Sequence, residues 1–372
     1  GSGAITFADT LSLDGGASVG PIEGSGAISF QDLSILASGS IGAVESRTST
    51  VTQSGTFSLG GDAEIASITA HGDIVLAKNA TLDLASGASI GAITSVSGAV
   101  PFGVAVDLAS GASIGTITGD SGVSFASTVS LASGASLGGV AGSGAITFAD
   151  TLSLDGGASV GAIEGSGVIS FQQIDGTGTG SMGEITSRSS DIFHLGDLSL
   201  GEGGSIGNLH AAGDINLLGS VTLQSGASLG NLSASGVVGI TELPGTSLQL
   251  GSGASIADIT GGFVELGRTG TELGPDASIA SITAKTGILF GSGGAPTTLG
   301  ASASIGDLEV TGSGAVVFHG DLSLGENASV GDLTAAGDDI TDSSGNLLVS
   351  GGIQFNGTVT LASGASLATG NT

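Results

Sequence analysis

The stretch LASGASIGTITG, residues 108–119, decides the fold of this 372-residue chain. It returns nearly unchanged as LASGASLGGVAG at 131–142 and as LDGGASVGAIEG at 154–165. In each copy an aliphatic residue follows the segment GAS, a small residue comes next, and a second aliphatic residue lies three positions after the first. Close self-similarity at a regular interval indicates repeated structural units stacked on one another, because each unit alone has too little apolar surface to form a core.

The aliphatic residue after GAS, or after its variants, serves as an anchor that can be followed through the whole chain. It recurs about fifteen times at a mean spacing of about 24 residues, a period typical of solenoids, propellers and arrays. The anchors are Val19, Ile41, Ile65, Ile90, Ile114, Leu137, Val160, Met182, Ile206, Leu229, Ile256, Ile279, Ile305, Val330 and Leu367.

The segments between the anchors alternate apolar and polar residues. TLSL at 10–13 and GAISF at 26–30 both do so, which is typical of short strands with one buried face. No segment keeps apolar residues at helical spacing, and the abundant glycines supply the positive φ values that sharp turns require. The sequence therefore predicts an all-β fold: a single continuous β-solenoid of about 15 coils, with about 24 residues per coil and no capping helices.

Equivalent positions of stacked coils form columns, and each column must accept its own residue type above and below. The small residue after the anchor is predicted to fill a corner that has no room for a side chain. The Ser before the anchor is predicted to hydrogen-bond from coil to coil, and a ladder of outward hydroxyls that orders water is the alternative. One aromatic column is predicted to contain Phe102, Phe125, Phe148, Phe171 and Phe193.

A longer repeat lies on top of the coil period. Residues 1–19 return unchanged at 142–160. We therefore expect residues 1–372 to form one β-solenoid domain, in which 1–141 and 142–282 are related by an approximate duplication of 141 residues.

The charge of the chain limits its partners. The formal net charge is −28, with only five basic residues, and no run of about 18 apolar residues occurs. Such an acidic surface repels nucleic acid and anionic lipid, so we expect neither nucleic-acid binding nor membrane insertion. Disulfides and thiolate metal sites are excluded because the chain has no Cys.

Residues suited to catalysis are scattered along the chain. His71, His194, His210 and His319 lie far apart in sequence, and the Gly-rich segments lack the Lys and the helix of a phosphate-binding loop. Solenoid enzymes that cleave acidic polysaccharides need clustered carboxylates and aromatic residues that stack on sugar, but Tyr and Trp are absent. We therefore expect no enzymatic activity and no catalytic residues.

The anchor spacing is broken once, by about 13 extra residues at 336–348. This acidic segment is predicted to be an inserted loop, either solvated or making a lateral contact bridged by a cation. No cofactor is expected, except for weakly bound Ca²⁺. The weak candidate ligands are Asp338, Asp339 and Asp342 in the insertion, and Asp14, Asp155 and Asp276 in turns.

The units of the form LxLxSGASIGxIxGSGxIxF resemble the extracellular β-solenoids of bacterial surface proteins, such as autotransporter passengers and filamentous haemagglutinin-type adhesins. The resemblance covers the whole chain and carries over no individual site residue. It implies a secreted bacterial protein, located outside the cell or at the cell surface, that serves adhesion or acts as structural material.

The two ends of the chain suggest how copies meet. GSGAITF at the start and LASGASLATGNT at the end are both partial coils. If a second copy of the sequence followed the first, the number of residues from Leu367 to the next Val19 would equal about one period. We expect a head-to-tail homopolymer in which half-coils complete one another. The predicted interface places Ile5, Phe7 and Leu11 of one subunit against Val359, Leu361 and Leu367 of its neighbour.

These expectations combine into one functional hypothesis. The chain is predicted to be a structural subunit of an extracellular filament, appendage or surface coat. Two alternatives stay open: a stalk segment of a larger bacterial adhesin, and an ice-binding or surface-binding solenoid.

Overall fold

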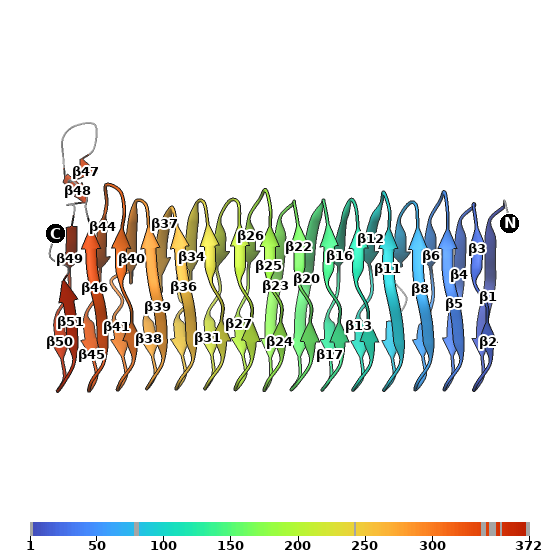
Figure 1. Ribbon diagram of the computed structural model, residues 1–372, viewed down its shortest axis with the longest axis horizontal. Helices are drawn as coiled ribbons and strands as arrows, with labels where there is room; N and C mark the ends of the chain where they lie inside the picture. Colours follow the sequence, from blue (N-terminus) through green and yellow to red (C-terminus); the bar gives the residue numbers. More distant parts are fainter. Residues whose placement is uncertain are drawn as a thin grey trace. The chain divides into compact units, whose positions relative to one another are not determined.

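The computed structural model describes residues 3–77, 82–241, 243–335, 340–341, 347–349 and 352–369 (Figure 1). These residues contain no helix, and their parallel strands stack into a β-solenoid of about 14 turns, roughly 23 residues apart. The predicted all-β solenoid is therefore confirmed, with a coil number and period just below the expected values. The chain divides into two compact units, Gly1–Arg188 and Ser189–Thr372. The organisation of 1–372 as one domain stays a prediction.

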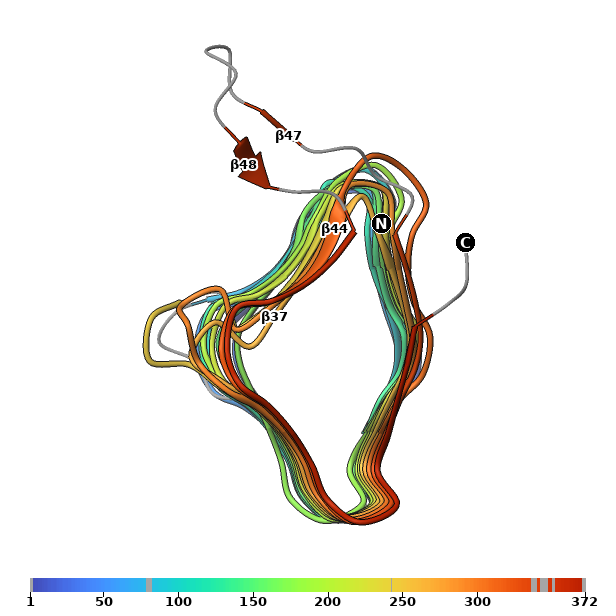
Figure 2. The same cartoon turned by 90° about the vertical axis from the view of Figure 1, so that its left-hand side faces the viewer.

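Each coil has two walls, and each wall contributes strands to a parallel sheet (Figure 2). We call the wall that contains the I-x-F and V-x-L strands the first wall, and the wall that contains the anchors the second wall. Successive coils pair without slippage at most positions. Val106 faces Val129 in the first wall, and Ile114 faces Leu137 in the second. The columns inferred from the sequence are therefore real neighbours in space.

In the unit Gly1–Arg188, the first wall is formed by β1 (Ile5–Leu13), β4 (Ile28–Ile35), β6 (Val51–Gln53), β7 (Phe57–Leu59), β9 (Ile74–Leu76), β10 (Leu82–Leu84), β12 (Ala99–Phe102), β13 (Val106–Leu108), β16 (Gly122–Phe125), β17 (Val129–Leu131), β20 (Ala145–Leu154) and β23 (Ile169–Gly176). Its second wall is formed by β2 (Ser18–Val19), β3 (Ile22–Gly24), β5 (Ser40–Ser46), β8 (Glu64–Ala70), β11 (Ser89–Ser95), β14 (Ser113–Ile114), β15 (Ile117–Gly119), β18 (Ser136–Leu137), β19 (Val140–Gly142), β21 (Ser159–Val160), β22 (Ile163–Gly165), β24 (Ser181–Met182) and β25 (Ile185–Ser187).

In the unit Ser189–Thr372, the first wall is formed by β26 (Ile192–His194), β27 (Leu198–Leu200), β30 (Ile215–Leu217), β31 (Val221–Leu223), β34 (Val237–Ile240), β35 (Leu248–Leu250), β37 (Phe263–Leu266), β38 (Thr271–Leu273), β40 (Gly287–Phe290), β41 (Thr297–Leu299), β44 (Ala315–Phe318), β45 (Leu322–Leu324), β49 (Gly352–Phe355) and β50 (Val359–Leu361). Its second wall is formed by β28 (Ser205–Ile206), β29 (Leu209–Ala211), β32 (Ser228–Leu229), β33 (Leu232–Ala234), β36 (Ser255–Gly261), β39 (Ser278–Ala284), β42 (Ser304–Ile305), β43 (Leu308–Val310), β46 (Ser329–Ala335) and β51 (Ser366–Thr369).

Two strands belong to neither wall. β47 (Ile340–Thr341) and β48 (Leu347–Val349) form a separate two-stranded antiparallel sheet. Both strands lie at or beside the acidic segment 336–348, and its assignment as an inserted loop stays a prediction.

The repeated phrase forms the turn between the two walls. In the copy at 108–119, the Ala112 N–H donates to the Ala109 carbonyl at 2.9 Å, which closes a four-residue turn. Gly111, the third residue of this turn, has φ +73°, a conformation that glycine adopts without a steric penalty. Ala112, the last residue of the turn, is fully buried. The sequence LASGAS therefore contains one tight turn that ends on a small inward residue.

The glycine after the anchor serves a different purpose. Gly115 has no positive φ, but a Cβ built on it would lie 3.0 Å from the backbone carbon and oxygen of Gly91 in the preceding coil. At Gly161 the same atom would lie 2.7 Å from the Gly139 nitrogen. These two glycines have no room for a side chain, as predicted, because two backbones approach closely. The predicted corner is not found in every coil, since Ala66 of β8 and Gly91 of β11 occupy the same position inside continuous strands.

The interior of the coils is a set of apolar columns, one of which is aromatic. The rings of Phe102, Phe125, Phe148 and Phe171 stack at centroid distances of 4.6, 4.6 and 5.0 Å. The prediction that Phe193 belongs to this kind of column is wrong. Phe193 is half-buried and faces Asn216, whereas the next residue along the chain is buried in the equivalent inward position. Side chains alternate along a strand, so a shift of one residue exchanges the two faces.

The serine column also differs from its prediction. Ser89, Ser113 and Ser136 are Cα neighbours on the outer face of the second wall and are partly exposed. Within the described residues, no hydroxyl of this column hydrogen-bonds to another residue of the chain. The expected hydroxyl hydrogen bonds between coils are therefore absent from the described residues, and the hydroxyls form an outward ladder. The backbone still links the coils here, because the Ser113 amide donates to the Ala88 carbonyl at 2.9 Å.

Candidate assembly interface

The N-terminal candidates lie on the inner side of the first described coil. Ile5, Phe7 and Leu11 belong to β1 and are partly exposed. Each is paired with the next coil: Ile5 faces Ile28, and the Phe7 ring stacks on Phe30 with centroids 4.9 Å apart and an interplanar angle of 2°. These three side chains therefore continue the interior columns of the unit.

The C-terminal candidates lie in equivalent places in the last described coil. Val359 faces Leu322, and Leu361 faces Leu324. Their exposed fractions are 37% and 48%, whereas interior members of the same columns are almost completely buried. Leu367 continues the anchor column of the second wall. All three therefore continue the columns of their unit.

The six candidates come from different units of the chain, so a contact between the two sets stays a prediction. Sequence reasoning also missed members of both surfaces. Phe355 stacks on Phe318 at 5.2 Å, and Ile353 faces Val316. Phe355 follows Phe318 by 37 residues in the sequence, because the extra residues lie between them. This irregular spacing is the reason that the sequence did not place Phe355 in an aromatic column. On the N-terminal surface, Leu13 was missed.

Three candidate metal ligands, Asp338, Asp339 and Asp342, lie outside the described residues. Of the turn candidates, Asp155 accepts a hydrogen bond from the Thr177 hydroxyl at 3.0 Å, and Asp276 has φ +56° within its turn. Among the described residues, no group of three or more His, Asp or Glu side chains is placed to hold a metal ion. The calcium hypothesis therefore stays a prediction.

Two other carboxylates are neighbours on the outer face of the first wall. Asp83 of β10 and Asp107 of β13 face each other one coil apart, in a shallow surface groove that also includes Ser58 and Ser130. Partial burial, followed by the charge of Asp83, raises the pKa of the Asp107 carboxyl above its ordinary value. The pair is a local concentration of negative charge.

His194 is a buried titratable group in the second unit. Its side chain is 2% exposed, and it faces Leu217 in the next coil. Burial lowers its pKa to about 4, although a hydrogen bond with the Gly196 backbone and the charge of Asp197 act in the opposite direction. The imidazole is therefore neutral at pH 7 and acts as a member of the core.

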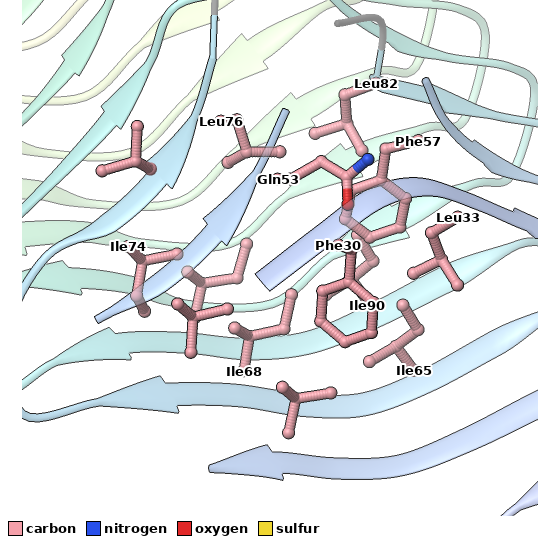
Figure 3. A pocket seen from close by; sticks show the side chains of 14 residues that line it. Phe30, Leu33, Gln53, Phe57, Ile65, Ile68, Ile74, Leu76, Leu82 and Ile90 are labelled. Atoms are coloured by element: carbon pink, nitrogen blue, oxygen red, sulfur yellow. The ribbon is translucent and has the colours of Figure 1, made fainter. Parts of the chain in front are cut away.

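A polar residue occupies the equivalent column in the first unit. Gln53 lies between Phe30 and Leu76, beside a cavity of about 20 Å³ (Figure 3). Its Nε2 donates to the carbonyls of Gln31 and Thr56 at 3.0 and 2.9 Å, while its Oε1 has no hydrogen-bond partner. The cavity has room for a water molecule, but a buried water normally makes two to four hydrogen bonds. The Gln53 Oε1 offers it one acceptor.

Two arginines neutralise part of the acidic surface. Arg47 forms ion pairs with Glu23 at 2.7 Å and Glu45 at 3.1 Å, and Arg188 pairs with Glu164. All these side chains are more than a third exposed, so the pairs contribute little to stability. These ion pairs involve two of the five basic residues of the chain. Because the chain has 33 acidic residues, its outer surface stays strongly acidic.

Comparison of the chain with protein-family models, characterised proteins and solved structures finds no match. Among the described residues, no helix has the length and apolar character needed to cross a membrane. The candidate function therefore depends on the geometry of the coils themselves.

Proposed function

We propose that this chain is a structural subunit of an extracellular filament, appendage or surface coat, and that it assembles end to end. One observation carries the proposal. The first and the last described coils display the same columns, aromatic on aromatic and aliphatic on aliphatic, that hold neighbouring coils together inside each unit. A coil of a second copy can therefore be accepted by the same contacts that stabilise each unit.

The composition supports a location outside the cell. Only five basic residues occur in 372, and two of them are engaged in ion pairs, so trypsin-like proteases have few sites to cleave. Resistance of this kind suits a protein that is exposed to the surroundings of the cell.

The serine ladder favours one second candidate, an ice-binding or surface-binding solenoid. Ser113 and its neighbours place one hydroxyl per coil on the outer face of the second wall, at the strand spacing of about 4.8 Å. Regularly spaced hydroxyls can order water. Thermal hysteresis in a freezing-point assay would favour this candidate, and its absence would leave the structural role.

The test of the structural role is the size distribution of the purified chain. Analytical ultracentrifugation and negative-stain electron microscopy over a hundredfold range of concentration should show open-ended polymers whose length grows with concentration. A monomer at every concentration would contradict self-assembly. That result would instead favour a stalk segment, in which the coils are covered by more of the same polypeptide.

A further inference from the structure

The sequence of the first coil occurs a second time in the chain, at a place where coils pack on both of its sides. AITFADTLSLDGGASV occurs at 4–19 and again, unchanged, at 145–160. The second copy stacks on the coil formed by residues 122–137. In this pair the rings of Phe125 and Phe148 lie 4.6 Å apart. The structure therefore shows one surface on which this sequence packs, namely the coil of residues 122–137.

That supporting coil has a close relative at the other end of the chain. GVSFASTVSLASGASL at 122–137 and GIQFNGTVTLASGASL at 352–367 are identical at 11 of 16 positions. Every inward side chain is the same except for Val123, which is replaced by Ile353. The other four differences lie at outward or loop positions, where the 122–137 copy is partly or fully exposed. The last coil thus presents nearly the same stacking surface as the coil that carries 145–160.

We propose that residues 352–367 of one copy bind residues 4–19 of a second copy in the register of the internal pair. The proposal deepens the proposed function, because it specifies the interface of the end-to-end assembly. The pairs that follow from the internal register are Ile353 with Ile5, Phe355 with Phe7, Val359 with Leu11, Leu361 with Leu13 and Leu367 with Val19.

The internal pair also gives the expected hydrogen bonds and burial. The Asp155 and Ser159 amides donate to the Leu131 and Ala135 carbonyls at 2.9 Å, so the Asp14 and Ser18 amides should donate to the Leu361 and Ala365 carbonyls. Val129 and Leu131 are each 1% exposed beneath their neighbour. Val359 and Leu361, now 37% and 48% exposed, should reach the same burial at the junction. The contact is strand addition supported by apolar columns.

A disulfide can report this register, because the chain has no cysteine of its own. The outward residues Ser12 and Thr360 are predicted neighbours, equivalent to Ser153 and Ser130 of the internal pair. Paired strands lie about 4.8 Å apart, which is within the range of Cα distances that a disulfide spans. The variant carrying Ser12→Cys and Thr360→Cys should form a ladder of covalent multimers on a non-reducing gel after mild oxidation.

Two controls fix the interpretation. The variant carrying Ser130→Cys and Ser153→Cys should close a bond within one chain and give no ladder. The variant carrying Thr10→Cys and Thr360→Cys is two residues out of register, so its ladder should be lost. Polymers in the electron microscope without a ladder from the in-register variant would overturn this interface but leave the proposed function standing. No polymers from any variant or from the intact chain would overturn both.

A second experiment separates the interface from general surface effects. Leu361 and Leu36 have the same exposed fraction, 48%, but Leu36 lies in a turn at the outer edge of its coil. Leu361→Asp should abolish polymers, because it places a carboxylate in the apolar column of the junction. Leu36→Asp should leave them unchanged. Polymers of normal length from Leu361→Asp would contradict the proposed pairing.

Discussion

The two kinds of glycine in the repeated phrase show how much a single residue decides in this molecule. Gly111 provides a positive φ inside the turn, while Gly115 provides space for the backbone of the neighbouring coil. Substituting either one therefore damages the protein for different reasons, strain at Gly111 and collision at Gly115.

We predict that Gly115→Val lowers the free energy of unfolding by about 1–3 kcal/mol, because the new side chain collides with the Gly91 backbone. Ser113→Thr, two positions away on the exposed face, should change it by less than about 0.5 kcal/mol. Urea melts followed by circular dichroism provide the measurement, since the chain has no Trp or Tyr for fluorescence. Equal effects from the two substitutions would contradict the close approach of the Gly115 and Gly91 backbones.

We predict that His194 makes the stability of the protein depend on pH. Its folded-state pKa is about 4, below the ordinary value of 6.5, so between these pH values the unfolded chain takes up a proton that the folded chain does not. Stability should therefore fall as the pH drops from about 6.5 to about 4, by at most about 3 kcal/mol from this group.

The contribution of His194 is measured by comparing the free energy of unfolding of the unmodified chain with that of two variants over the same pH range. His194→Leu, which matches the Leu217 that follows it in the column, should remove this part of the pH dependence. His210→Gln should leave it unchanged, because His210 is exposed. The same slope in all three proteins would mean that the His194 imidazole is not responsible.

Side-chain acceptors connect successive coils at the strand ends. The Asp73 carboxylate accepts a hydrogen bond from the Ala99 amide at 2.8 Å, and Asp191 and Asp214 do the same for the next coils of the second unit. In most of these links a glycine precedes the donor. A Cβ on Gly98 would lie 2.4 Å from the Asp73 Oδ1, so the glycine makes the approach of the carboxylate possible.

We predict that Asp214→Ala destabilises the protein by about 1 kcal/mol, because the Val237 amide loses its acceptor. Asp214→Asn should retain most of the stability, since an Asn amide oxygen plays this role at Asn208, where it accepts from the Asn231 amide at 3.0 Å. Urea melts of the two variants provide the comparison. If Asn costs as much as Ala, the effect comes from charge and the hydrogen-bond assignment is wrong.

The chain as a whole carries a formal charge of −28, and we expect this charge to oppose side-by-side contact between copies. The columns proposed to make the end-to-end contact are apolar, whereas the outer faces carry carboxylates such as the neighbouring Asp83 and Asp107. End-to-end growth and side-by-side bundling should therefore respond differently to ions.

We predict that lateral association is repelled at low ionic strength and promoted by NaCl, and more strongly by Ca²⁺ at equal ionic strength. Light scattering across both series measures bundling, while electron microscopy of the same samples reports filament length as the control. Scattering that is indifferent to both ions would show that side contacts are not governed by charge.

Local sequence determined the parts of this protein that depend on neighbours along the chain. The turn at Gly111 requires a residue that tolerates positive φ, and the alternation in segments such as 10–13 requires strands with one buried face. The period then makes stacking unavoidable, because one coil cannot bury its apolar face alone. The all-β solenoid and most interior columns followed from these facts.

Tertiary structure alone decided the features that depend on the coil above or below. In DIFHLG at 191–196 the pattern allows either Phe193 or His194 to face inward, and the pairing with the next coil selects His194. The sequence did not reveal, for the same reason, that the hydroxyls of the described serine ladder make no hydrogen bonds within the chain, or that Phe355 belongs to an aromatic column. Neighbours in a column lie one coil, about 23 residues or more, apart along the chain, so no local pattern contains them.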